Sequence, residues 1–385
     1  MAKFLLSALA LLSIFLLTQR DIVEAPELTG SIETERMSIR IDTILADLES
    51  PWGMVFLPDG GMLFTEKKGE LRLYKDGKLH PKPIGGLPEV RYKGQGGLLD
   101  IELHPDYAHN GWLYISYSEP AQEGEAGDPE GGNTTFIRAR LQNHHLINKE
   151  VIFNAKPNYK QTLHYGGRIE FDQQGYLYLT VGDRGGRPEA QLLSTYRGKV
   201  LRLNDDGSIP ADNPFVGRDG AHPEIYSYGH RNPQGLALNP VTGQIWEHEH
   251  GPRGGDEVNI VQKGLNFGWP TISYGINYDG SILTEDTVME GMEQPVIFWR
   301  PSIAPCGMSF LSSSRYPQWE GNLLVGSLKF RYLARCEVQN DQIVHQEKLL
   351  DGLGRVRVVR QSPDGYIYVG TEAPGLIVRI LPSGS

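Results

Sequence analysis

A short apolar run recurs six times along the chain, opened each time by a glycine and closed by charged or polar residues. The runs are GMLFTE from Gly61, GWLYISYSE from Gly111, GYLYLTVGD from Gly175, GQIWEHEHG from Gly243, GNLLVGSLK from Gly321 and GYIYVGTE from Gly365. Aliphatic and aromatic residues alternate with other residues in them, a period typical of β-strands. A second apolar segment lies just upstream and a third lies downstream in nearly every copy. Each copy is therefore expected to supply at least three antiparallel strands.

Repeats of roughly 45 to 70 residues built from short strands are typical of radial β architectures, because each small sheet needs neighbours on both faces to bury its apolar side chains. Turns such as Pro-Asp-Gly and Asp-Asp-Gly separate the strands and indicate hairpins. The sequence therefore predicts an all-β, six-bladed β-propeller over residues 45–385. One or two β-sandwiches with similar hairpins are the alternative.

The N-terminal segment differs from the repeats. Lys3 precedes an apolar run from Phe4 to Leu17, and a polar stretch follows it. This is the pattern of an export signal, and about 14 apolar residues are few for a membrane span. We expect residues 1–25 to be a signal peptide or a signal anchor, residues 26–44 to be a linker, and the protein to be periplasmic or otherwise exported.

Net charge and cysteine content limit the partners. The formal net charge of −10 and the absence of basic stripes argue against nucleic acid and against an anionic lipid surface. No stable membrane partner is expected, and the sequence is compatible with a monomer or a homodimer. Cys306 and Cys336 are the two cysteines, and either a disulfide or two free thiols is compatible with their spacing.

Polar residues of several kinds occupy equivalent positions of the repeats. Since equivalent blade ends face the central channel, we expect these side chains to converge at one mouth. Those before the upstream strands are Gln95, His164, Arg231, Asn232, Arg355 and Arg357, and those after the glycine-bounded runs are Asp183, residues 249–252 and Lys329. An acid, a histidine, several cations and amide donors together predict an anion-binding cleft beside a titratable base.

Four stretches carry a family resemblance. They are HYGGRIEFDQQGYLYLTVGDRG from His164, YSYGHRNPQGLALNP from Tyr226, EHEHGPRGGDEVNIVQKGLNFGWP from Glu247 and the closing RVRVVRQSPDG. With SLK from Ser327, they resemble the soluble quinoprotein sugar dehydrogenases, which are PQQ-dependent glucose and aldose dehydrogenases. The resemblance extends from about Leu48 to the C-terminus and is strongest to the bacterial aldose sugar dehydrogenases.

The resemblance implies oxidation of an aldose at C1 to a lactone, with PQQ and Ca²⁺ as cofactors and an external electron acceptor. His164 would be the general base while hydride passes to C5 of PQQ, and Asp183 would orient and polarise its imidazole. Arg231 would face the quinone oxygen where negative charge develops. The residues that would hold the quinone and its carboxylates are Gln95, Arg231, Asn232, Lys329, Arg355 and Arg357.

The resemblance also implies two calcium sites. Backbone carbonyls of Gly251 and Pro252 would hold the ion that polarises the quinone. Glu257 would belong to a second, structural site, to which residues 267–279 could contribute. The family's NYGWP occurs here as NFGWP from Asn266, a difference that a backbone-carbonyl ligand survives and a hydroxyl contact does not.

Two other functions remain open. A six-bladed propeller with a divalent metal could be a sugar lactonase, although the predicted mouth carries more cations than carboxylates. A noncatalytic propeller that binds a protein or a glycan is the third class, and the set of His164, Asp183, Arg231 and Lys329 argues against it.

Overall fold

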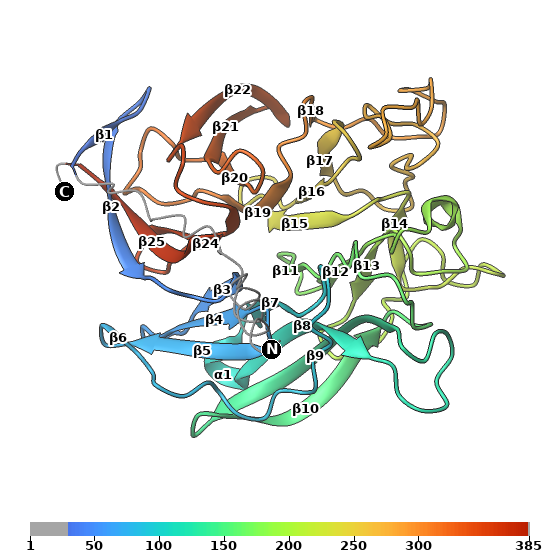
Figure 1. Cartoon of the computed structure of the whole chain (residues 1–385), viewed down its shortest axis with the longest axis horizontal. Helices are drawn as coiled ribbons and strands as arrows, with labels where there is room; N and C mark the ends of the chain where they lie inside the picture. Colours follow the sequence, from blue (N-terminus) through green and yellow to red (C-terminus); the bar gives the residue numbers. More distant parts are fainter. Residues whose placement is uncertain (1–29, 384–385) are drawn as a thin grey trace, which may run out of the picture.

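The computed structural model describes residues 30–383, and it arranges six antiparallel sheets in a ring (Figure 1). The predicted six-bladed β-propeller is therefore confirmed. The first three blades are β3 (Pro51–Phe56), β4 (Met62–Glu66), β5 (Glu70–Lys75) and β6 (Lys78–Leu79); β7 (Leu98–Leu103), β8 (Trp112–Pro120), β9 (Gly132–Gln142) and β10 (His145–Asn154); and β11 (Ile169–Phe171), β12 (Leu177–Val181), β13 (Lys199–Leu203) and β14 (Ile225–Tyr228).

The other three blades continue around the ring. They are β15 (Pro233–Leu238), β16 (Ile245–Glu249), β17 (Asp256–Ile260) and β18 (Ile297–Trp299); β19 (Pro305–Phe310), β20 (Leu323–Ser327), β21 (Leu333–Gln339) and β22 (Gln342–Leu349); and β23 (Val356–Gln361), β24 (Ile367–Glu372) and β25 (Gly375–Pro382) with β2 (Ser38–Leu45) and β1 (Ile32–Glu33). The described helices are α1 (Tyr107–Asn110) and the 3₁₀ turn η1 (Arg187–Gln191). No helix among residues 30–383 is long and apolar enough to cross a membrane.

The N-terminal boundary differs from the expected one. Within the segment predicted as a linker, β2 pairs antiparallel with β25, and β1 pairs with β2. The side chain of Ile39 is fully buried in the core of the last blade, and Ile41 packs against the same core. The alternating run SIRIDTIL therefore completes the last blade and closes the ring. The predicted signal segment, residues 1–25, lies outside the described residues.

The core lies between neighbouring blades. Every residue of β4, β12, β16 and β20 is buried, because these second strands lie inside their sheets with a blade on either side. Between the fourth and fifth blades, the rings of Trp246 and Phe310 meet edge to face with centroids 5.4 Å apart. Cys306 and Cys336 are both buried free thiols, the second of the two outcomes that the sequence left open.

One residue from each blade contributes to a layer across the central channel. These residues are Trp52, Asp100, Arg168, Gln234, Cys306 and Arg357, each in or directly before the innermost strand. The Arg168 guanidinium lies over the Trp52 ring at 3.9 Å from its centroid. It also donates to the backbone carbonyls of Gln234 at 2.7 Å and Arg357 at 3.0 Å. The layer thus joins strands far apart in sequence and forms a floor for the mouth above it.

Candidate active site

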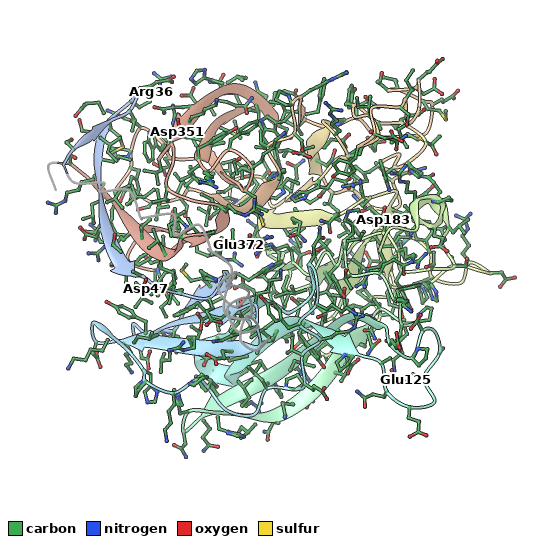
Figure 2. The ribbon with its side chains drawn as sticks, in the orientation of Figure 1. Arg36, Asp47, Glu125, Asp183, Asp351 and Glu372 are labelled. Atoms are coloured by element: carbon green, nitrogen blue, oxygen red, sulfur yellow. The ribbon has the colours of Figure 1, made fainter. Side chains whose placement is uncertain are left out.

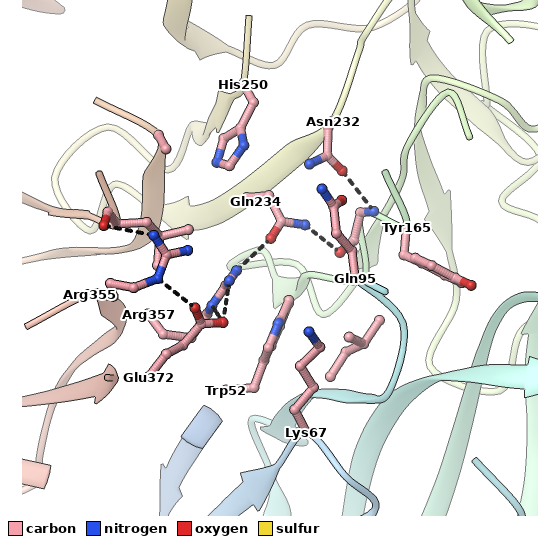
Figure 3. Close-up of a pocket in the computed structure, with 14 residues that line it drawn as sticks. Trp52, Lys67, Gln95, Tyr165, Asn232, Gln234, His250, Arg355, Arg357 and Glu372 are labelled. Carbon is pink, nitrogen blue, oxygen red and sulfur yellow. Dashed lines mark hydrogen bonds and ion pairs between the residues drawn. The ribbon is translucent and has the colours of Figure 1, made fainter. Parts of the chain in front are cut away.

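A cavity of about 290 Å³ opens above this layer and draws its walls from all six blades (Figure 3). Trp52, Gln234 and Arg357 of the layer are part of its lining. The lining residues include four of the predicted cofactor-binding residues: Gln95, Asn232, Arg355 and Arg357. The repeat phasing thus brings residues of the second, fourth and sixth blades to one cavity.

One side of the cavity carries an excess of positive charge. Arg355 and Arg357 both donate to Glu372, with Nε–oxygen distances of 3.2 and 2.8 Å, and Lys67 lines the same space. Burial alone would raise the pKa of Glu372, but the charges of Arg357 and Arg355 outweigh burial and hold it below its ordinary value. Burial lowers the pKa of Lys67, against the attraction of Glu372. Three cations face one carboxylate, which favours a ligand carrying several negative charges.

Sequence reasoning missed Lys67 and Glu372. Both stand at the end of a glycine-bounded run, the position from which Asp183 and Lys329 were predicted. Lys67 directly follows the first run, and Glu372 ends the sixth. Lys329 was predicted at this position and is exposed instead, with its Nζ 5.0 Å from the centre of the Phe330 ring. Its neighbour Leu328 lines the cavity.

His164 and Asp183 form a pair on the opposite side of the mouth. The His164 Nδ1 lies 2.6 Å from Asp183 Oδ1, and the Asp183 side chain has no exposed surface. His164 precedes β11, and its backbone N–H donates to Gln95 Oε1 at 2.7 Å. The chain after β12 approaches closely, since a Cβ on Gly182 would lie 2.2 Å from the His164 carbonyl oxygen. Glycine at that position lets the two loops meet.

The environment sets the protonation of this pair. Burial lowers the pKa of His164, and the nearby charges of Arg231 and Arg184 lower it further against the opposing effect of Asp183. For Asp183, burial raises the pKa, but the contacts with His164, Arg231 and the Gly185 N–H outweigh it and leave it below the ordinary value. The imidazole is therefore neutral and the carboxylate ionised at neutral pH. With Nδ1 donating to Asp183, Nε2 has a free lone pair.

Arg231 contacts the carbonyl of a predicted metal ligand. Its Nη1 donates to the carbonyls of His250 at 2.9 Å and Gly251 at 2.8 Å, while its buried Nε has no protein partner. Arg231, Gly251 and Glu257 line a much smaller second cavity beside the main one. Pro252 is in the lining of neither cavity.

A buried acidic cluster lies next to this second cavity. Ligand atoms of His230, Glu247 and Glu249 lie within 4.8 Å of one another. Burial, together with the charges of Glu249 and Glu247, raises the pKa of Glu257 well above its ordinary value. The Glu247 Oε2 is buried without a partner. Two of these ligand atoms belong to carboxylates, and Glu257 stands opposite Glu249 in the strand pairing, so the cluster can offer several carboxylate oxygens to a hard divalent cation such as Ca²⁺. The sequence had indicated only Glu257 as a ligand.

A family model described as Glucose / Sorbosone dehydrogenase matches residues 48–379. The chain belongs to this family. The predicted sugar dehydrogenase is thereby confirmed at the level of the family.

Relatives of this dehydrogenase include the aldose sugar dehydrogenase YliI of Escherichia coli, which is 41% identical over 92% of this chain and 96% of its own. The quinoprotein glucose dehydrogenase B of Acinetobacter calcoaceticus is 35% identical over 71% of this chain and 61% of its own length. Among solved structures, the PQQ-bound aldose sugar dehydrogenase of Streptomyces coelicolor has a TM-score of 0.73 and 26% identity, covering 91% of this chain and 99% of its own.

Proposed function

We propose that this protein is an exported PQQ- and Ca²⁺-dependent dehydrogenase that oxidises aldoses at C1 to lactones and passes the electrons to an external acceptor. The observation that carries the proposal is the 2.6 Å contact between His164 and the buried Asp183, beside a cavity with three cations and one carboxylate. The relatives support the same reaction class.

His164 acts as the general base. Its Nε2 takes the proton from the C1 hydroxyl of the sugar, and the imidazolium that forms is stabilised by Asp183 at 2.6 Å. Because the base is largely shielded from water, with 13% of its side chain exposed, the proton passes from the sugar hydroxyl in a nearly dry site. Arg231 places a positive charge at the same mouth.

The cavity fits the cofactor's charge. PQQ, a planar tricarboxylate, supplies the hydride-accepting quinone when it is bound. Arg355 and Arg357 would hold its carboxylates, with Lys67 adding a third cation and Gln95 and Asn232 amide contacts. The exposed Lys329 would join them from the rim. Carbonyls of Gly251 and Pro252 would contact the cofactor's calcium, and Glu257 with its acidic neighbours would hold a structural one.

The test is dye-linked oxidation of a panel of aldoses by purified apoprotein. PQQ and Ca²⁺ are added separately and together, and NAD serves as the cofactor control. We expect turnover only with PQQ and Ca²⁺ together, and a lactone as product. Saturable PQQ binding without oxidation of any aldose would contradict the proposal, and hydrolysis of sugar lactones by the metal-loaded protein would favour a lactonase.

A further inference from the structure

The carboxylate of Asp183 accepts hydrogen bonds on both oxygens, and the donors come from two different blades. Oδ1 accepts from His164 at 2.6 Å and from the backbone N–H of Gly185 at 2.7 Å. Oδ2 accepts from the indole Nε1 of Trp269 at 2.8 Å. Trp269 belongs to the segment that follows β17 in the fourth blade, whereas His164 and Asp183 flank strands of the third. In residues 30–383, this indole is the one side-chain donor to Oδ2.

The position of Trp269 is fixed by contacts that do not involve the pair. Its backbone N–H donates to the Gly229 carbonyl at 2.8 Å, and its own carbonyl accepts from Gln191 Nε2 at 2.8 Å. The side chain is almost fully buried, and the Arg231 guanidinium lies 5.2 Å from the ring centre. The indole is thus a fixed donor against which the carboxylate can be oriented.

We propose that Trp269 is a positioning residue of the His164–Asp183 pair, whose indole N–H fixes the orientation of the Asp183 carboxylate and so the basicity of His164. Only the effect on turnover rests on the proposed function, since the hydrogen bonds are contacts between groups of the protein itself. The family resemblance assigned no role to this side chain itself, which lies in the NFGWP stretch and within the 267–279 segment considered for the structural calcium site.

The sign of the effect follows from charge. A donor to Oδ2 stabilises the ionised carboxylate, so its loss makes the pair take up a proton at higher pH. It also leaves a buried oxygen without a partner, which loosens the carboxylate about its remaining bonds to His164 and the Gly185 N–H. The other charged or titratable groups that act on the pair stay in place, namely Arg184, Arg231 and His250 near His164, and Lys199 near Asp183.

The variant Trp269→Phe keeps an aromatic ring and removes the donor. Trp299→Phe is the matched control. Trp299 lies on the outer strand β18, and its Nε1 also donates to a side-chain oxygen, that of Gln346, at 2.8 Å. The first measurement is an NMR titration of ¹⁵N-histidine-labelled apoprotein, with the His164 signals assigned by their loss in His164→Asn. We expect the His164 pKa to rise in Trp269→Phe and to stay unchanged in Trp299→Phe.

The second measurement is the pH profile of the reconstituted enzyme. For Trp269→Phe we expect kcat to fall about 10- to 100-fold, the acidic limb to move to higher pH, and PQQ affinity to change less than about twofold. An unchanged or lowered His164 pKa would overturn the inference, whatever the activity. An inactive wild-type protein would instead overturn the proposed function while the titration still decides the role of Trp269.

If Trp269→Phe does not fold, as judged by circular dichroism, 3-benzothienylalanine at position 269 replaces it. This analogue keeps the size and shape of the indole and lacks the N–H. We expect the same rise in the His164 pKa, and an unchanged value in the folded analogue would equally overturn the inference.

Discussion

The two sides of the mouth differ in how their charged groups are paired. On the side of the third and fourth blades, each oxygen of one buried carboxylate has a donor, and His164 is the partner whose Nε2 stays free. On the side of the first and sixth blades, Lys67, Arg355 and Arg357 face the single carboxylate of Glu372. Figure 2 shows Glu372 near the centre of the ring and Asp183 over toward the third and fourth blades.

The difference teaches how one mouth can hold a base and a ligand independently. A general base needs a fixed orientation and a set protonation state, which hydrogen bonds from the protein to every oxygen of its carboxylate partner can provide. An anion-binding wall gains affinity when the ligand supplies the missing negative charge, so its cations outnumber its carboxylates. Changes on one side should therefore affect turnover and changes on the other should affect cofactor binding.

The largest expected effect comes from removing the base. His164→Ala deletes the proposed general base and should lower kcat by about 10²- to 10⁴-fold. PQQ affinity, measured by fluorescence titration, should stay within about threefold, because Lys67, Arg355 and Arg357, the cation wall of the cavity, are unchanged. His80→Ala changes a half-buried histidine just after the outer strand β6 of the first blade, and this control should retain full activity. Persistent turnover in His164→Ala would remove this residue from the role of base.

The next largest effect is expected from removing cations on the other side of the mouth. The double variant Arg355→Ala and Arg357→Ala removes two charged donors, and at about 1.5–3 kcal/mol for each such hydrogen bond it should weaken PQQ binding by at least about 100-fold. The kcat at saturating PQQ should fall much less. Arg138→Ala with Arg140→Ala is the matched control, since these arginines show the same alternation on β9 and contact Trp112 away from the mouth. Equal PQQ affinity in the two double variants would show that Arg355 and Arg357 do not hold the cofactor.

Much of this comparison could be predicted from the sequence. The alternation and the turns gave six sheets, and the repeat phase placed His164, Asp183, Arg355 and Arg357 at one end of them. The strand pattern of each repeat was sufficient in these cases, because each residue lies near the end of a strand that the pattern predicts.

The features that could not be predicted depend on contacts between distant segments. β2 joins β25 across the two ends of the chain, as in the ion pair between Asp42 and Arg379 at 2.8 Å. Trp269 reaches Asp183 from an irregular segment that has no repeat phase. The acidic cluster needs the register that places Glu247 opposite Asn259 and Glu249 opposite Glu257. Spacing along one strand does not contain that information.

The smallest expected effect separates the members of the cation wall. Lys67→Met keeps the apolar stem and removes one of three cations, so PQQ affinity should fall by about tenfold, which is about 1.4 kcal/mol, with kcat unchanged at saturation. Lys68→Met is a matched control from the next position, because Lys68 pairs with Glu49 and Glu70 at 2.9 and 3.5 Å instead of lining the cavity. The Lys67 Nζ donates to the Gly94 carbonyl at 2.9 Å, next to Gln95. A variant that lowered kcat and left PQQ affinity unchanged would therefore place Lys67 in support of the Gln95 and His164 loops, and the division between the two sides of the mouth would not hold at this residue.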